Sequence, residues 1–401
     1  MESRLPFLTR WSVRRFELGV FALALAVRVA ALVVFQVKGL GEAYGRDLYF
    51  NLALSWLGHL PMPDFDATHP PLFTLVIAAV LGALRTSSQL PILIFNVLVG
   101  SASVVLARRA GVRLLDEKTA RLAALWIALD PALIFFTPQL QTETLFIGMI
   151  LAFFWGLFAL WDEPLSWRHA ALGLWGGLAV TCRSVFGAFP GFLFFALWRA
   201  KGFARALLFC VLLAPGWFLP SGLWTARNYL RYGELIPLSG QMGSTLWEGF
   251  TLDREVVRTR PPEMRAETTR LGYGDRAVGP FFFERWKAFV RENPLQSAVI
   301  VAGKAVLYWR PWLYDPYPVW QRAVMGAYFT VLFAFALLGV RAVRRSRAPW
   351  GAVWAVLAYH TAVHAVFLTT LRYRVPLEPF LVFLAAAGAA PYLERPAGKR
   401  G

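Results

Sequence analysis

Long apolar segments separated by short polar loops recur along nearly the whole chain. Each segment approaches the roughly 20 residues that an α-helix needs to cross a bilayer, and the alternating pattern typical of a β-barrel is absent. The pattern predicts an all-α polytopic membrane protein with about ten transmembrane helices. The spans are predicted over residues 17–37, 90–107, 119–137, 144–161, 169–182, 185–198, 203–223, 319–340, 350–371 and 375–392.

Composition and charge agree with a membrane protein. Hydrophobic residues make up 57% of the chain, well above an ordinary soluble domain. The net charge of +17 would suggest nucleic acid as the partner of a soluble protein. Here most arginines stand between apolar segments, where membrane topology and lipid headgroups explain them, so no nucleic-acid partner is expected. Cys182 and Cys210 both fall in apolar segments, which excludes a disulfide framework.

The basic clusters set the orientation of the spans. Clusters at residues 10–15, 108–113 and 341–347 fall on one side only if both chain termini lie in the cytoplasm. The apolar piece at 71–84 is short for a span, and one extra crossing would move the 108–113 cluster outside. It is therefore predicted to lie in the membrane interface.

This topology divides the chain into three regions. Residues 1–223 form an N-terminal transmembrane core with a first outer loop at 38–89, and residues 319–401 form C-terminal transmembrane helices. The region between them, 224–318, is predicted to be extracytoplasmic, with amphipathic helices over 281–290 and 295–309.

The predicted topology gathers polar residues at the outer face. Asp47 follows the first span, Glu143 starts a later span, and Arg372 and Arg374 stand at the outer end of another. Singly, each has a plain explanation, because an acid can complement a helix dipole and an arginine can reach lipid headgroups. Together they suit a reaction in which an acid removes a proton while cations hold a departing phosphate.

At these residues the sequence resembles the GT-C glycosyltransferases. It is most similar to bacterial members of glycosyltransferase family 39, which include protein O-mannosyltransferases and the aminoarabinose transferases that act on lipid A. The resemblance covers most of the chain, through the order and spacing of several motifs. These are "GRDLYFNLALSWLGHL", "HPPLFTLVIAAVLGAL", "RLAALWIALDPALIFFTPQLQTETLF", "GLWGGLAVTCRSVFGAFPGFLFFAL", "WTARNYLRYGELIPLS" and "RYRVPLEPFLVFLAA".

The resemblance implies a GT-C type helix bundle and an inverting sugar transfer at the outer face of the bacterial cytoplasmic membrane. Asp47 matches the catalytic aspartate of the family, which activates or positions the acceptor hydroxyl, and Glu143 matches its second acid. The donor would be a polyprenyl-phosphate sugar, and the acceptor a lipid, a glycan or a protein. A transporter or lipid flippase is the alternative function, although no internal repeat supports it.

Basic residues are the candidates for donor phosphate. Arg372 and Arg374 come first, since a guanidinium fork matches phosphate oxygens, and Arg227 and Lys304 come second. The intramembrane Arg28 could equally reach the headgroups or pair with Asp130.

A divalent metal is a further option at the outer face. His69, placed with the substrate-binding residues, could ligate a metal together with Asp66, but the sequence offers no obvious third ligand. His360 and His364 stand one helical turn apart, a spacing also seen in zinc-binding helices. No glutamate lies between them in the zinc-protease pattern, so this pair is predicted to pack rather than to bind metal.

Overall fold

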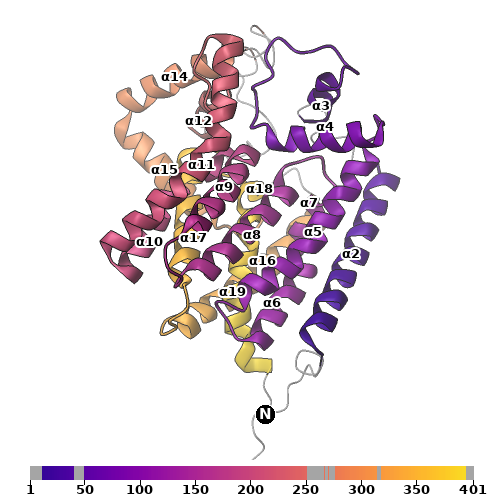
Figure 1. The fold of residues 1–401 in the computed structure, drawn as a ribbon, viewed down its shortest axis with the longest axis vertical. Helices are drawn as coiled ribbons and strands as arrows, with labels where there is room; N and C mark the ends of the chain where they lie inside the picture. Colours follow the sequence, from indigo (N-terminus) through magenta and orange to yellow (C-terminus); the bar gives the residue numbers. More distant parts are fainter. Residues whose placement is uncertain are drawn as a thin grey trace, which may run out of the picture.

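The computed structural model describes residues 11–39, 49–250, 266, 270, 276–313 and 318–393. Asp47 lies outside these residues. The described part of the chain contains helices and no strand, and the long helices stand side by side in one bundle (Figure 1). The predicted all-α class is therefore confirmed.

Among the described residues, the longer helices build the bundle, and several shorter helices lie at its upper end, the top of Figure 1. The bundle contains α2 (Val13–Val37), α5 (Leu90–Gly111), α6 (Glu117–Ala128), α8 (Glu143–Leu160), α9 (Trp167–Cys182), α10 (Phe189–Lys201), α11 (Phe203–Tyr232), α16 (Val319–Val343), α17 (Trp350–Val366) and α19 (Glu378–Ala389). The other helices are α3 (Asn51–Trp56), α4 (Leu72–Leu84), α7 (Pro131–Phe136), α12 (Met242–Phe250), α14 (Val278–Glu292), α15 (Pro294–Tyr308) and α18 (Leu371–Arg374), with 3-10 turns at Ser184–Phe186, Val375–Leu377 and Ala390–Leu393.

Six helical segments among the described residues are long and apolar enough to cross a membrane. They are Val13–Val37, Leu90–Gly111, Glu143–Leu160, Phe203–Tyr232, Val319–Val343 and Leu371–Leu393. The chain is thus a multi-pass membrane protein, and the count of ten spans stays a prediction.

The span predicted over residues 119–137 is divided in the structure. Helix α6 ends at Ala128, and α7 begins at Pro131. Asp130 separates them, because its carboxylate accepts hydrogen bonds from the backbone N–H groups of Ala132 and Leu133, and Pro131 suits the first position of the new helix. The mean hydropathy stays high across this break, because a single aspartate lowers it only slightly. A prediction from mean hydropathy therefore joins the two helices into one span.

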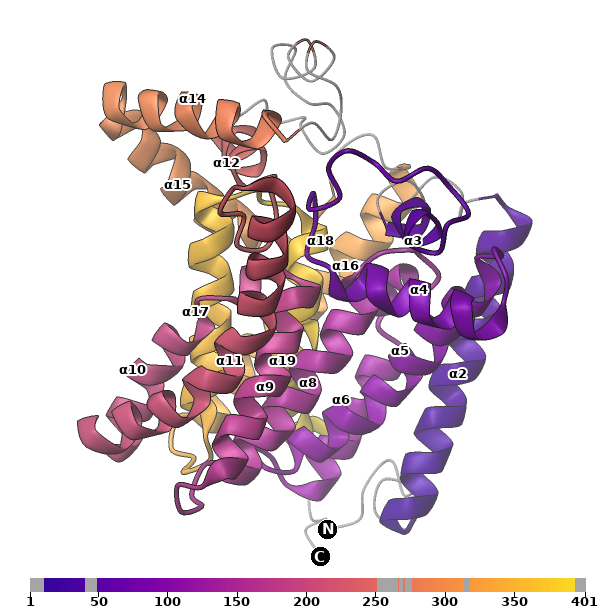
Figure 2. The ribbon, with the colours of Figure 1, turned by 45° about the horizontal axis from the view of Figure 1, so that its top comes forward.

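The short apolar segment α4 lies across the bundle at its upper end, at a steep angle to α2 and α5 (Figures 1 and 2). This arrangement agrees with the interfacial interpretation of residues 71–84. The two predicted amphipathic helices are also present, as α14 and α15 beside α12 (Figure 2).

Glycines let two pairs of helices approach closely. A Cβ atom on Gly173 of α9 would lie 2.0 Å from the Leu213 carbonyl oxygen of α11, and one on Gly339 of α16 would lie 1.8 Å from the Leu384 carbonyl oxygen of α19. Such close backbone packing is typical of small residues between membrane helices. These contacts hold α9 against α11 and α16 against α19.

Candidate active site

A buried carboxylate at the start of α8 joins two arginines from distant parts of the chain. Glu143 is fully buried, and its Oε1 accepts a hydrogen bond from Arg183 Nη1 at 2.8 Å. The same oxygen is paired with Arg372 Nε, while Arg372 Nη2 lies 3.4 Å from Oε2. We call these three residues the Glu143 cluster.

Local structure brings each member to the cluster. Glu143 occupies the first turn of α8, where a negative charge complements the helix dipole. Arg183 is the residue at which α9 ends, and its extended backbone (φ −143°, ψ 112°) turns the chain away from the helix axis. Arg372 belongs to the short helix α18. All three stand at helix ends, where the chain changes direction.

Aromatic rings enclose the Arg183 guanidinium. Its Cζ lies 5.3 Å from the ring centroid of Tyr373 and 5.7 Å from that of Phe146. Tyr373 stacks on His364 with centroids 4.9 Å apart, and His364 stacks in turn on Tyr308 at 5.5 Å. Cation–π contacts of this kind hold a guanidinium in one orientation away from bulk water.

Two residues of the first outer loop, His69 and Tyr49, feel the charges of the Glu143 cluster. Burial and then the positive charge of Arg372 lower the pKa of the His69 imidazole to about 4. Burial raises the pKa of the Tyr49 hydroxyl to about 12, and the charges of Arg372, Glu143 and Arg183 also act on it. The two rings meet edge to face at 5.2 Å. His69 and Tyr49 are therefore neutral near pH 7 and lie within the field of the cluster.

Asp66 anchors the same loop to the end of α11. Its carboxylate is held by Arg227 through bonds of 2.6 and 2.5 Å and accepts a third from the Tyr232 hydroxyl at 2.5 Å. Burial alone would raise the pKa of Asp66, but these bonds outweigh it and the pKa is lowered. Arg227, predicted to bind donor phosphate, thus forms an ion pair with Asp66 in this structure.

The metal option finds no support in this arrangement. Asp66 faces Arg227, Tyr232 and Arg231 rather than His69, whose Nδ1 lies 3.1 Å from the Thr68 hydroxyl. Among the described residues, no group of three or more histidine, cysteine, aspartate or glutamate side chains could hold a metal ion.

The remaining predicted phosphate ligands also bond to protein groups. Lys304 is buried in α15, donates to the Val366 carbonyl at 3.0 Å, and has its pKa lowered to about 7 by burial. Arg374 donates to the Tyr308 and Arg310 carbonyls at 3.1 and 2.5 Å, and its Nε lies 3.6 Å from Glu378. A phosphate contact by either residue stays a prediction.

Arg374 and Arg372 point in different directions because they share a helix. Residues two apart on a helix are separated by about 200° around its axis. Arg372 faces Glu143, whereas Arg374 lies over Phe329 of α16 at 4.3 Å and is fully buried. The structure therefore does not place the two arginines in one fork.

A second polar group lies inside the bundle. Asp130 pairs with the Tyr328 hydroxyl of α16 and caps α7, while the buried Arg28 of α2 donates to the Ala128 carbonyl at 3.2 Å. Arg28 thus lies inside the protein near Asp130 and does not reach toward lipid headgroups.

An apolar groove lies beside the end of α9. It has a volume of about 630 Å³ and is lined by side chains of α11 and of the segment after it, such as Trp217, Phe218 and Leu235. Val180 and Gly187, which flank Arg183 in sequence, also line it. Its chemistry suits a hydrocarbon chain.

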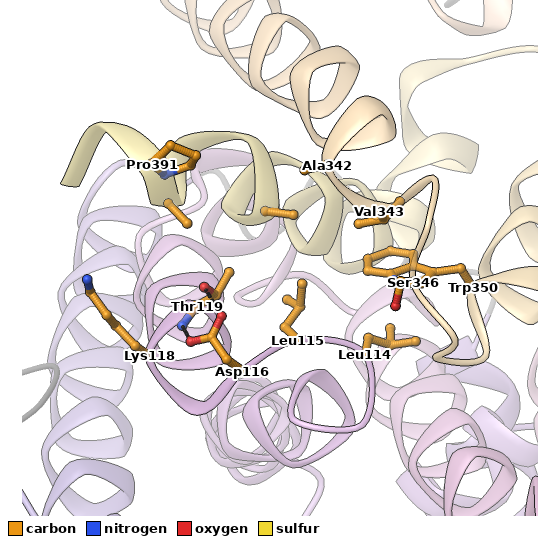
Figure 3. Close-up of a pocket in the computed structure, with 12 residues that line it drawn as sticks. Leu114, Leu115, Asp116, Lys118, Thr119, Ala342, Val343, Ser346, Trp350 and Pro391 are labelled. Carbon is orange, nitrogen blue, oxygen red and sulfur yellow. Dashed lines mark hydrogen bonds between the residues drawn. The ribbon is translucent and has the colours of Figure 1, made fainter. Parts of the chain in front are cut away.

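Another cavity, of about 380 Å³, is shown in Figure 3. It is lined by the end of α16, the end of α19 and the α5–α6 connection, where the Asp116 carboxylate accepts bonds from the backbone and hydroxyl of Thr119. Asp116 is the N-cap of α6, so its carboxylate already serves the fold.

The structure thus joins two of the predicted site residues, Glu143 and Arg372, and His69 feels the charge of Arg372. Arg227, Lys304 and Arg374 lie in separate contacts, and Asp47 falls outside the described residues. The sequence interpretation missed Arg183. Its signal was an arginine directly after an apolar segment, a position at which a charge near the membrane interior is often functional.

Comparisons with known proteins agree with the fold. A family model described as "Dolichyl-phosphate-mannose-protein mannosyltransferase" matches residues 68–224. That segment contains His69, Glu143 and Arg183. No curated protein sequence matches this chain.

Among solved structures, the chain is similar to an archaeal oligosaccharyltransferase from Archaeoglobus fulgidus. The complex of AglB with an inhibitory peptide and a dolichol-phosphate superimposes with a TM-score of 0.52 at 11% identity, covering 95% of this chain and 51% of that one. The apo form gives 0.57 at 14% identity, covering 94% and 50%. This chain therefore spans about half the length of the solved structures that it matches, and the likeness is one of fold.

Proposed function

We propose that this chain is a glycosyltransferase of the GT-C type and transfers a sugar from a polyprenyl-phosphate donor to a lipid, glycan or protein acceptor. The transfer would take place at the extracytoplasmic face of the bacterial cytoplasmic membrane. The observation that carries the proposal is the Glu143 cluster, in which two arginine cations meet at one buried carboxylate.

The donor would bind with its phosphate at the cluster and its tail in lipid. Arg372 offers a planar fork of N–H donors, which suits phosphate oxygens. The apolar groove beside the end of α9 would take part of the isoprenoid chain. AglB has been solved with a dolichol-phosphate and a peptide, which supports a lipid-phosphate donor and a lipid or protein acceptor as the kinds of partner.

Asp47 would be the general base. It stands two residues before Tyr49, which is buried and lies within the field of the Glu143 cluster. Asp47 would take the proton of the acceptor hydroxyl, while Glu143 orients the arginines and the acceptor.

The displacement would invert the anomeric carbon. The acceptor oxygen attacks that carbon as its bond to the phosphate oxygen breaks, and the electron pair of this bond leaves with the phosphate. A single in-line step of this kind gives inversion, and holding both partners in place supplies much of the rate. The neutral His69 could donate to or accept from the sugar or the phosphate at this site.

A transfer assay with Asp47→Asn tests this function. Purified wild-type protein and variants would be mixed with labelled polyprenyl-phosphate sugars and total membrane extract. We expect label on a new species with wild type and a loss of at least about 100-fold with Asp47→Asn, the size typical of a lost general base. Asp64→Asn is the matched control, since Asp64 is an exposed acid of the same loop. Near-normal transfer by Asp47→Asn would remove Asp47 from the mechanism, and label that crosses sealed vesicles unchanged would favour a transporter.

A further inference from the structure

We infer that Arg183 is a second ligand of the departing phosphate, acting with Arg372 and stabilising the charge that develops as the sugar leaves. This inference rests on the proposed function and assigns a role to a residue that the sequence interpretation passed over. It is based on the geometry of the cluster, in which two guanidinium groups from distant segments meet at one carboxylate oxygen, Glu143 Oε1.

The charges of the Glu143 cluster do not balance. Among the described residues, Arg183 and Arg372 share one buried carboxylate, and the neighbouring His69 and Tyr49 are neutral near pH 7. One positive charge is therefore left over in a region where Glu143 is fully buried and Arg183 is 9% exposed. An uncompensated buried charge is costly, so this site favours an anion.

The guanidinium of Arg183 has donors left for such an anion. Arginine carries five N–H donors, and Glu143 takes one of them through Nη1 in the described part of the chain. The rings of Tyr373 and Phe146 hold the group in place without using those donors. Arg183 is thus oriented and still able to bind oxygen atoms beside Glu143.

The position of Glu143 Oε1 indicates where a phosphate oxygen would lie. An oxygen close to this point could accept from both arginines, as Oε1 does now. The arginines reach that point from α9 and α18, so they approach it from two separate segments. Two convergent guanidinium groups around one oxygen form an arrangement that matches phosphate well.

The reaction explains why a second cation would matter. Before transfer, the donor phosphate is a diester with one negative charge. As the bond between the anomeric carbon and the phosphate oxygen breaks, that oxygen receives the electron pair and the acceptor proton goes to the base. The product phosphate is a monoester with nearly two negative charges above its second pKa of about 6. A cation that binds this added charge stabilises the transition state more than the bound donor.

The test compares two lipids that differ in this charge. Undecaprenyl phosphate is the monoester probe, and undecaprenyl methyl phosphate is the diester probe, both measured for binding to the full chain in detergent at pH 8. We expect Arg183→Met to weaken monoester binding roughly 10- to 100-fold, the range for one charge-assisted hydrogen-bonded contact, and diester binding by less than about 3-fold. Arg183→Lys keeps the charge but not the fork, and should fall between wild type and Arg183→Met.

Arg108→Lys is the matched control. Arg108 is also a buried arginine held by carboxylates, with Glu17 at 3.0 Å, but it lies in the 108–113 cluster at the end of α5. We expect it to bind both lipids as wild type does.

The outcomes separate the inference from the proposed function. Equal weakening of both lipids by Arg183→Lys and Arg183→Met would mean that Arg183 only supports the fold of the site, and would overturn the inference. Unchanged binding in both variants would overturn it as well. If wild type bound neither lipid, the donor class of the proposed function would fail together with the inference. Should Arg183→Met not fold, the lipid preference of Arg183→Lys decides.

Discussion

Replacing Glu143 by glutamine should destabilise the protein as well as slow the transfer. Glutamine keeps the size of the side chain and one accepting oxygen, so the change mainly removes the negative charge. Arg183 and Arg372 are then left close together without a counter-charge. The predicted effect is thus mainly electrostatic, and the weaker of the two Arg372 contacts, from Nη2 at 3.4 Å, is lost with it.

The magnitude follows from burial. Breaking a buried ion pair by removing one partner costs about 3–5 kcal/mol. Arg372 keeps 32% of its side chain exposed, so water can solvate part of its charge, while Arg183 is nearly buried. We therefore expect the free energy of unfolding to fall by about 2–4 kcal/mol. For a chain of this size that corresponds to a fall of several degrees in the unfolding midpoint.

Thermal unfolding of the detergent-solubilised protein measures this loss. Asp162→Asn is the control, because Asp162 also pairs with a cation, Lys201, but its side chain is 81% exposed and the pair should contribute less than about 1 kcal/mol. A double variant, Glu143→Gln with Arg183→Gln, should be more stable than the sum of the two single losses, since it no longer leaves both guanidinium groups uncompensated. An unfolding midpoint of Glu143→Gln equal to that of wild type would refute the electrostatic reasoning.

Two further predictions concern the outer loop and the helix packing. The folded pKa of His69, about 4, lies below its ordinary value of 6.5, so the unfolded chain binds a proton that the folded one does not as the pH falls from 6.5 to 4. The free energy of unfolding should therefore decrease over that range. Between pH 7 and pH 5, the unfolding midpoint of His69→Gln should fall by less than that of wild type. An equal fall in both proteins would show that His69 is protonated freely in the folded protein. Gly173→Ala should markedly lower the yield of monodisperse protein and its unfolding midpoint, because the new Cβ would lie 2.0 Å from the Leu213 carbonyl oxygen. Gly191→Ala on α10 is the control. A Cβ there meets nothing within 4 Å, so this variant should be neutral or slightly stabilising. Equal behaviour of the two alanine variants would contradict the close packing of α9 and α11.

Much of the fold could be predicted from the sequence because membrane helices follow local rules. Hydropathy located the helices of the bundle, and the shortness of residues 71–84 together with the basic clusters indicated that α4 lies across the bundle. The break between α6 and α7 was missed, although an aspartate followed by a proline is the pattern of a helix start. In that case a local signal was present but was outweighed by the mean hydropathy.

The amino-acid sequence alone was enough to predict the all-α membrane class, the position of most helices and the types of residue at the upper end. These properties depend on the order of residues within each segment. The tertiary structure decided which of the charged groups meet: Arg183 and Arg372 at Glu143, Arg227 at Asp66, and Arg374 at Glu378. These partners lie 4 to 229 positions apart in the chain. Their pairing depends on how the helices pack and which way each side chain points, and neither follows from the hydropathy pattern.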